Sequence, residues 1–379
     1  MATRTALRPL PSTASLVRED DVGQVSPWRL IWRRFRQNRL SMFGSLMLLA
    51  LYLAVAFAEF VAPNAFDELD SEYPWAPPTP VRVTRLGLAF SPLISRLDSA
   101  NFEFVFELDT EHPLPLRFFV RGYPYKLLGL FPADIHLIGV PAAAGTEKTP
   151  KFFLWGADRQ GRDVFARVLH GGRVSLTVGV VSVAIATVLG AILGTASGYY
   201  GGWIDNLMQR AIELIQTFPT IPLWAALAAI LPPNLPVTQR YIFITIILSF
   251  ISWTGLARQV RGKVLSYRAA DYTAAAQAAG ASDLRIILTH LAPNSLSHII
   301  VVAALAIPGT ILGETALSFL GLGMLPPAVS WGVLIREAQQ VQVILRYPWL
   351  LLPGVAVVLS VLCFSFLGDG LRDAADPYG

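Results

Sequence analysis

The residues best placed to do chemistry in this chain are two carboxylates that interrupt long uncharged stretches. Glu213 lies at the start of one such stretch, and Glu314 divides another. If these stretches cross a membrane, a charge near mid-bilayer costs on the order of 3 kcal/mol, so its side chain usually faces a cavity or a partner. Glu314 is therefore a candidate pathway or gate residue. The alternative is a hydrogen bond between helices that fixes their packing.

Familiar motifs for catalysis, metal binding and nucleotide binding are missing from the sequence. No Gly-x-x-x-x-Gly-Lys-Ser/Thr phosphate loop occurs, and the histidines show no metal-ligand spacing. The histidines are His112, His136, His170, His290 and His298. We expect no metal, no cofactor and no catalytic residue here, so an energy source would come from another subunit or an ion gradient. A membrane protease using Ser318 and a histidine is disfavoured, because serine commonly serves as a polar packing residue in membrane spans.

The uncharged stretches themselves predict an all-α polytopic membrane protein. Of the 379 residues, 54% are hydrophobic and 15% are charged, against about 25% charged in an ordinary soluble domain. The charge is missing from stretches long enough to cross the hydrocarbon core as helices, which takes about 20 residues. A soluble helix would instead carry charge along its outer face. We predict six transmembrane helices, at about 40–61, 174–198, 208–231, 241–257, 295–323 and 347–368.

Arginines that precede the first span predict that the N-terminus faces the cytoplasm. They run from Arg29 to Arg39 with no acidic residue among them. With six spans, the segment 258–294 and the C-terminus lie on the same side. We expect residues 1–39 to form a cytoplasmic tail with a basic amphipathic segment, and 370–379 to form a second cytoplasmic tail. The net charge of +4 reflects this bias, and no basic domain face indicates nucleic-acid binding.

Residues 62–173 are too long for a simple connection between the first two spans. Short aromatic and β-branched runs at 102–108 and 116–120 are separated by prolines and a glycine. That composition is typical of strands and turns. We predict a small β-rich extracytoplasmic insert over about 63–155, followed by a lead-in to the second span. The insert either docks a soluble partner or serves as a stabilising lid.

Glycines recur every four residues in the second predicted span, at Gly190, Gly194 and Gly198. In lipid, such a stripe lets two backbones approach closely, where van der Waals contact is the main attraction. The stripe therefore predicts helix packing. It packs either within this chain or against a partner subunit.

The segment 258–294 is long for a connection and predicts two short helices. Asp271 can cap a first helix that runs through Ala279, and Gly280 suits the left-handed residue that ends it. This helix is nearly all alanine. A helix without side-chain bulk can enter a groove on another protein, although alanine is also simply a good helix former.

The second short helix is predicted to follow at once. Ser282 or Asp283 can cap its N-terminus. It is expected to stop before Pro293, because proline disrupts a helix interior.

Several sets of residues occur in an order that chance does not explain. Within the segment 258–294 they are Ala275-Ala276, Gly280-Ala281-Ser282-Asp283-Leu284 and His290-Leu291-Ala292-Pro293-Asn294. Elsewhere they are residues 155–163, 198–202, 314–323, Pro326-Pro327, 330–332 and 368–373. Together they resemble ATP-binding-cassette (ABC) importer permeases, specifically the C-type subunit of the dipeptide/oligopeptide subfamily in its long-loop variant.

The resemblance implies a six-helix type I ABC importer permease fold in the cell (inner or plasma) membrane. The chain would form half of a pathway for peptides or a similar small solute. It would pair with a homologous second permease, two ATPases that bind ATP and Mg²⁺, and an extracytoplasmic solute-binding protein. The residues that match the ATPase-coupling motif are Asp271, Ala275, Ala276, Gly280, Ala281, Ser282, Asp283 and Pro293.

Two residues depart from the family's motifs. Ala274 stands where the coupling motif usually has glutamate, and Ala157 stands where the family has threonine. The first change argues against an acidic contact with an ATPase at that position, but it leaves the small-residue helix and the turn glycine. The alternative function is a secondary transporter driven by an ion gradient. That class shows internal repeats and several charges within its spans, and neither is evident here.

Overall fold

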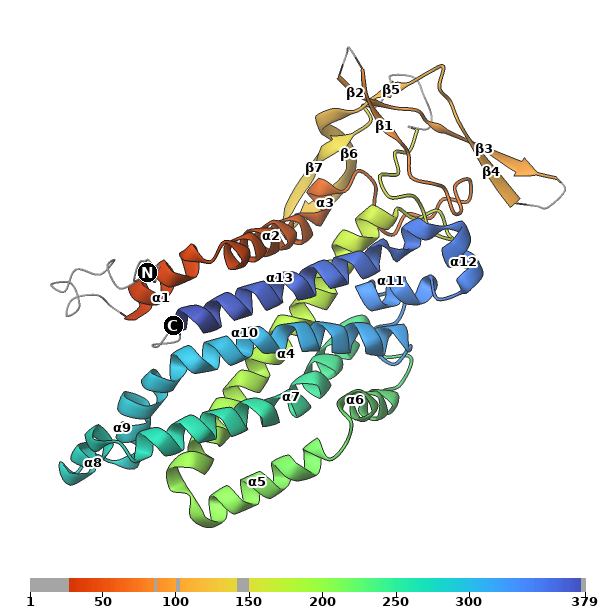
Figure 1. The fold of residues 1–379 in the computed structure, drawn as a ribbon. Coiled ribbons are helices and arrows are strands. Elements are labelled where there is room, and N and C mark those ends of the chain that lie inside the picture. The colour runs from red at the N-terminus through yellow and green to blue at the C-terminus, as the bar shows by residue number, and fades with distance from the viewer. Residues whose placement is uncertain (1–26, 85–86, 100–102, 142–149, 376–379) are drawn as a thin grey trace, which may run out of the picture.

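Long helices make up most of the molecule, and strands gather at one end of them (Figure 1). The computed structural model describes residues 27–84, 87–99, 103–141 and 150–375. Most of the expected N-terminal tail, the last residues of the C-terminal tail and residue 102 of one expected strand therefore lie outside the described residues. The helices are α1 (Pro27–Gln37), α2 (Arg39–Ala56), α3 (Ala58–Val61), α4 (Val164–Tyr200), α5 (Gly202–Gln216), α6 (Thr220–Ala229), α7 (Val237–Arg268), α8 (Asp271–Ala278), α9 (Asp283–Ile286), the π-helix η3 (Ile287–Leu291), α10 (Ala292–Phe319), α11 (Trp331–Glu337), α12 (Val341–Arg346), the 3₁₀-helix η4 (Pro348–Leu351) and α13 (Leu352–Ala375).

Within the described residues, five helical stretches are long and apolar enough to cross a membrane. They are α2, α4, α7, the run from Asp283 to Phe319 and the run from Pro348 to Ala375. The pair α5 and α6 could make a sixth crossing, although the two helices are bent by 83°.

The third predicted span, over 208–231, is not one continuous helix. The chain leaves α5 after Gln216 and begins α6 at Thr220. Pro219 explains the break, because proline lacks a backbone N–H and disfavours helical geometry at the residue before it, Phe218.

Other helices extend beyond the predicted spans at one or both ends. α4 begins at Val164, well before residue 174, because Asp163 caps it by accepting hydrogen bonds from the N–H groups of Phe165 (2.9 Å) and Ala166 (3.5 Å). Its first turns carry charged side chains that the search for uncharged stretches excluded. α7 likewise continues to Arg268. In contrast, the first predicted span is divided, since α2 stops at Ala56 and the short α3 follows as far as Val61.

The described part of 81–139 forms seven strands in antiparallel pairings. They are β1 (Val81–Thr84), β2 (Gly87–Phe90), β3 (Leu93–Asp98), β4 (Glu103–Leu108), β5 (Leu114–Pro115), β6 (Arg117–Leu127) and β7 (Phe131–Gly139). The order β1-β2-β5 forms one sheet, while β3–β4 and β6–β7 form two hairpins. The β6–β7 hairpin lies beside α3 (Figure 1).

α4 is the central helix of the bundle, with α7, α10 and α2 packed against it. α13 packs between α2 and α10. One apolar cluster joins α2, α4, α10 and α13 near the strands and includes Leu176, Ile311 and Trp331, all fully buried. The bundle therefore fixes α4, α7 and α10 relative to one another, and these helices carry the residues considered next.

Candidate functional site

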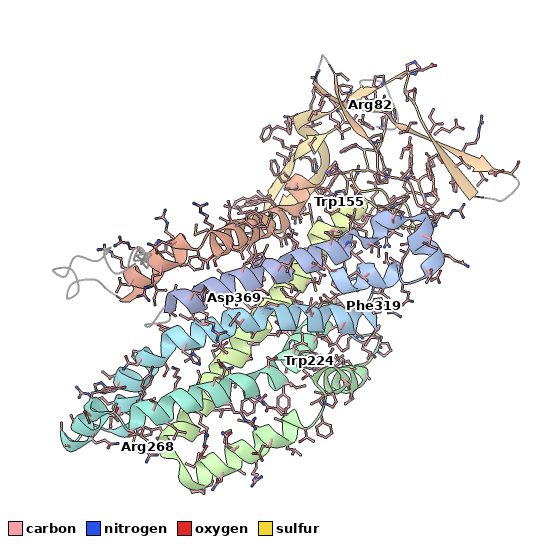
Figure 2. All side chains as sticks on the ribbon, in the orientation of Figure 1. Arg82, Trp155, Trp224, Arg268, Phe319 and Asp369 are labelled. Carbon is pink, nitrogen blue, oxygen red and sulfur yellow. The ribbon has the colours of Figure 1, made fainter. Side chains whose placement is uncertain are left out.

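The connector, defined here as residues 269–291 between α7 and α10, lies at the end of the molecule opposite the strands (Figure 1). In Figure 2, Arg268 marks the end of α7 from which the connector leads into α8. The side chains of Ile286 and Leu291 are fully buried in a cluster with Val260 and Val264 of α7. The connector is therefore packed onto the bundle.

Two polar contacts add to this attachment. The hydroxyl of Tyr199, at the end of α4, donates a 2.7 Å hydrogen bond to Asp283 Oδ1. The buried hydroxyl of Thr273 donates a 2.8 Å bond to the carbonyl of Tyr267 on α7. These bonds attach α8 to α7 and α9 to α4.

The exposed surface of α8 and of the turn that follows it consists largely of small residues. Ala275, Ala278, Ala279 and Gly280 are exposed, and Ala276 and Ala281 are half-buried against the bundle. Because so little side-chain bulk covers α8, a partner protein can approach its backbone closely.

Gly280 has the left-handed conformation that the sequence predicts, with φ +79°. The N–H of Gly280 donates to the carbonyl of Gln277 (2.9 Å), and that of Ala281 donates to Ala276 (3.1 Å). This pair of bonds is the Schellman motif that commonly ends a helix at glycine. Among the described residues, no atom lies within 4 Å of the position that a Cβ would take at Gly280.

The predicted caps and end of the connector helices need correction. Asp271 is the first residue of α8, and Ala270 holds the cap position. Ser282 holds the cap position of α9, but its side chain makes no capping hydrogen bond among the described residues. The second helix does not stop before Pro293, because the wider π-turn η3 leads directly into α10, and Pro293 lies in the first turn of α10.

Glu314 is fully buried where α4, α10 and α11 meet. Ser175 donates a 2.7 Å hydrogen bond to its Oε2 and Ser318 donates one of 2.7 Å to its Oε1. Ser175 Oγ in turn accepts the N–H of Trp331 at 3.1 Å. This is the geometry of the packing alternative, and a gating role for Glu314 stays a prediction.

The other acidic candidate, Glu213, lies on the last turns of α5 in an exposed position. Arg210 donates a 2.9 Å hydrogen bond to it. A pair this exposed contributes little to stability.

The glycine stripe lies against α7 of the same chain. A Cβ on Gly190 would lie 2.9 Å from Leu256, one on Gly194 would lie 2.5 Å from the carbonyl oxygen of Ala257, and one on Gly198 would lie 2.9 Å from that of Arg261. The structure therefore uses the stripe within the chain, which is the first of the two alternatives.

A second feature, not predicted above, is a groove between α7, α10 and the α5–α6 break. It consists of two adjoining cavities of about 280 and 360 Å³ that share Ser252, Gly255 and Ala306. Further lining residues are Thr187, Gln216, Phe218, Thr220, Gln259, Gly309 and Thr310. Within the described part of the chain, the lining of the groove carries hydroxyl and amide groups but no charge.

The sequence does contain signals that could have located this groove. Gly255 and Gly309 meet no atom within 4 Å of a Cβ position among the described residues. Pro219 breaks the facing helix, and broken helices commonly line substrate sites in transporters. In Figure 2, Trp224 marks α6 beyond that break.

The segment 155–163 closes the strand-side end of the bundle. Buried Asp158 accepts hydrogen bonds from the N–H of Gln160 (2.8 Å) and from Arg162 Nε (2.8 Å), and it also pairs with buried Arg167. Arg167 reaches Glu337 of α11 at 2.7 Å. This network joins the lead-in, α4 and α11.

Comparison with known proteins matches most of the chain to transport permeases. A family model described as binding-protein-dependent transport system inner membrane component matches residues 186–378. A model described as the N-terminal TM domain of oligopeptide transport permease C matches residues 26–78.

Curated relatives carry similar descriptions. A putative peptide permease of Brucella ovis is 39% identical over 265 residues, which cover 69% of this chain and 83% of the relative. The oligopeptide transport system permease OppC of Haemophilus influenzae is 42% identical over 62% of this chain and 73% of its own length. The glutathione transport system permease GsiD of Escherichia coli is 31% identical over 99% of this chain and 96% of its own length.

Proposed function

We infer the function from one premise: this chain belongs to the family of binding-protein-dependent transport system inner membrane components. It is a membrane permease subunit of an ABC importer, and its family is one of transport permeases and not of catalytic enzymes. We propose that its cargo is peptides or a similar small solute. Relatives described as peptide, oligopeptide and glutathione permeases support this class of cargo.

The proposed transporter contains a homologous second permease, two ATPases that bind ATP and Mg²⁺, and an extracytoplasmic solute-binding protein. The connector end would face the cytoplasm and the strands would face the opposite side of the inner membrane. The arginines before α2 support this orientation, because basic residues concentrate on the cytoplasmic side of membrane spans. An ATPase partner is required on this view, since the sequence has no phosphate loop of its own.

The observation that carries the coupling role is the exposed small-residue face of the connector, attached firmly to two long helices. An ATPase would receive α8 in a groove, and its movement on binding ATP would push the connector. Tyr199–Asp283 and the buried Ile286 and Leu291 would pass that push to α4, α7 and α10. ATP and cargo can then bias the same two-state arrangement of helices, as coupling requires.

The groove is the proposed pathway surface of this subunit. Its hydroxyl and amide groups can hydrogen-bond to peptide main chains, and an uncharged lining does not select for the charge of the side chains. We propose that α7 and α10 present this surface to the second permease, so that the two subunits enclose the cargo.

Substitution of Gly280 tests the coupling role. In Gly280→Asp a side chain and a charge would project from the exposed turn, and we expect cargo uptake to be lost while the protein still inserts in the membrane. Gly280→Asn is the matched variant, because asparagine and aspartate both tolerate a left-handed backbone and differ in charge. Gly87→Asp places the same side chain at another positive-φ glycine (φ +115°), at the strand end, and should retain uptake.

The assay is uptake of a labelled mixture of dipeptides to pentapeptides by proteoliposomes that contain the complete transporter. Retention of the ATPase subunits during purification is measured in parallel. We expect Gly280→Asp to reduce both ATPase retention and uptake, and Gly280→Asn to have a smaller effect. Full uptake and full ATPase retention in Gly280→Asp would exclude the connector as the coupling element.

A further inference from the structure

We propose that the tip of the β6–β7 hairpin, residues Leu127–Phe131, inserts into the lipid leaflet on the strand side of the membrane and anchors the strand region there. The proposal depends on α2 crossing the membrane. It does not depend on the cargo or on the coupling role of the connector, so its failure would leave both of those proposals standing.

The composition of the tip is the reverse of an ordinary turn. Turns usually carry glycine, proline or small polar residues, whereas here the sequence is Leu127-Leu128-Gly129-Leu130-Phe131. Three of these large side chains are well exposed: Leu128 by 52%, Leu130 by 74% and Phe131 by 64%. Leu128 also has a positive φ of 52°, which a branched side chain rarely adopts. Contiguous exposed apolar groups of this kind mark an interaction surface.

The position of the tip, beside the last turn of α2, indicates that it contacts the membrane. Midway along the hairpin, His136 Nδ1 lies 2.8 Å from the carbonyl oxygen of Glu59 in α3, which holds the hairpin against that helix. From there the hairpin runs toward the strand-side end of α2 (Figure 1). Leu127 shares an apolar cavity of about 430 Å³ with Leu53, Ala54, Phe57, Phe60 and Val61. Since Leu53 and Ala54 form the last turn of the α2 span, the tip lies at the depth of that turn.

The tip also continues a surface that already faces lipid. Leu46, Leu49 and Leu53 recur along one face of α2 and are all exposed. A single span whose apolar face is this open is covered by hydrocarbon in the membrane. Leu53 is also a wall of the cavity that Leu127 lines, so the exposed face of α2 and the hairpin tip are continuous.

The backbone and the flanking residues of the tip fit this environment. Backbone polar groups in lipid must be hydrogen-bonded internally. Here the N–H of Gly129 donates to Lys126 (3.0 Å), that of Leu130 donates to Leu127 (3.0 Å), and Leu127 pairs with Phe131. Tyr125 and the exposed Lys126 come directly before the tip. Aromatic and long basic side chains are enriched at the membrane interface, where their polar ends reach water.

Depth-dependent quenching of a fluorophore tests the proposal. Leu130→Cys, in a Cys363→Ser background, is labelled with a nitrobenzoxadiazole (NBD) dye in the complete transporter, reconstituted in phosphatidylcholine vesicles. Val83→Cys is the matched control, because Val83 is an exposed apolar strand residue (86%) in β1. We expect nitroxides near the lipid headgroup to quench the label at position 130 several-fold more than the label at 83, and aqueous iodide to show the reverse order.

Either of two quenching results would overturn the proposal. If iodide quenches the label at position 130 as strongly as the label at 83, the tip lies in water. If neither quencher reaches position 130, a protein partner covers the tip. Because a dye can insert by itself, Phe131 is also replaced by the photoreactive amino acid benzoylphenylalanine. We expect phospholipid adducts by mass spectrometry, and adducts only to another subunit would likewise exclude a lipid anchor.

Discussion

Glycines on neighbouring helices serve opposite purposes in this molecule. Those of the α4 stripe, Gly190, Gly194 and Gly198, would place a Cβ 2.5–2.9 Å from α7. In contrast, Gly255 on α7 and Gly309 on α10 meet no atom within 4 Å of a Cβ position in the described part of the chain. All lie in apolar helices, so only the surface opposite each glycine distinguishes them. The stripe joins two helices, and the open glycines leave space where cargo could pass.

The largest expected effect, on stability, comes from adding a large side chain to the packed glycine stripe of α4. In Gly194→Leu the new side chain would meet the backbone carbonyl of Ala257, which cannot move away as a flexible side chain could. We expect the free energy of unfolding to fall by about 3 kcal/mol, at the upper end of the usual cost of overpacking. The measurement is thermal unfolding and recovery of folded protein in detergent.

The control for Gly194→Leu is Gly354→Leu in α13, where the closest atom to a Cβ lies 4.0 Å away. That variant should match the unmodified protein. If Gly194→Leu were equally stable, α4 and α7 would not be packed as closely as the structure shows.

An intermediate effect, on transport alone, is expected from adding a large side chain at an open glycine that faces the groove. Gly255→Phe places a ring in the groove, and its Cβ would meet no atom within 4 Å among the described residues, so we expect the melting temperature to be unchanged. Uptake should fall by about tenfold, because a narrower pore limits the passage of solute. Gly354→Phe is the matched control, and normal uptake in Gly255→Phe would remove the groove from the pathway.

The smallest effect is expected from replacing Glu314, the buried carboxylate between α4 and α10. Glu314→Gln keeps the size of the side chain and can still hydrogen-bond to Ser175 and Ser318, so stability should change by about 1 kcal/mol. Uptake should be retained if Glu314 serves packing. Loss of uptake with normal stability would support a gate, and would also revive an ion-coupled transporter that uses this carboxylate.

The sequence was most informative where a local rule applies. Gly280 was expected to be left-handed because an alanine helix precedes it and a cap residue follows, and the chain closes a Schellman turn there. The membrane character was evident from uncharged stretches. The ends of the helices were harder to predict from uncharged stretches. Arg167 lies at the start of α4, and it is buried there because it pairs with Asp158 and Glu337, which lie outside this helix.

Other features depend on residues far apart in the chain. The groove combines side chains of the α5–α6 break, α7 and α10. The apolar hairpin tip can be proposed as a membrane anchor only because Leu127 lies beside Leu53 of α2. No local pattern predicts such neighbours. The full break between α5 and α6 was not predicted, because a proline such as Pro219 can either kink or break a span and its packing decides which.

By itself, the sequence determined that this protein is built from apolar helices, that a small-residue helix in the connector ends at a left-handed glycine, and that its motifs are those of a permease. Hydrophobicity and backbone preference are local properties, so the order of residues suffices for them. Only the tertiary structure decided which glycines pack and which stay open, and that Glu314 is held by serines from two helices. Those outcomes depend on which surfaces meet, and that is set by the packing of the whole bundle.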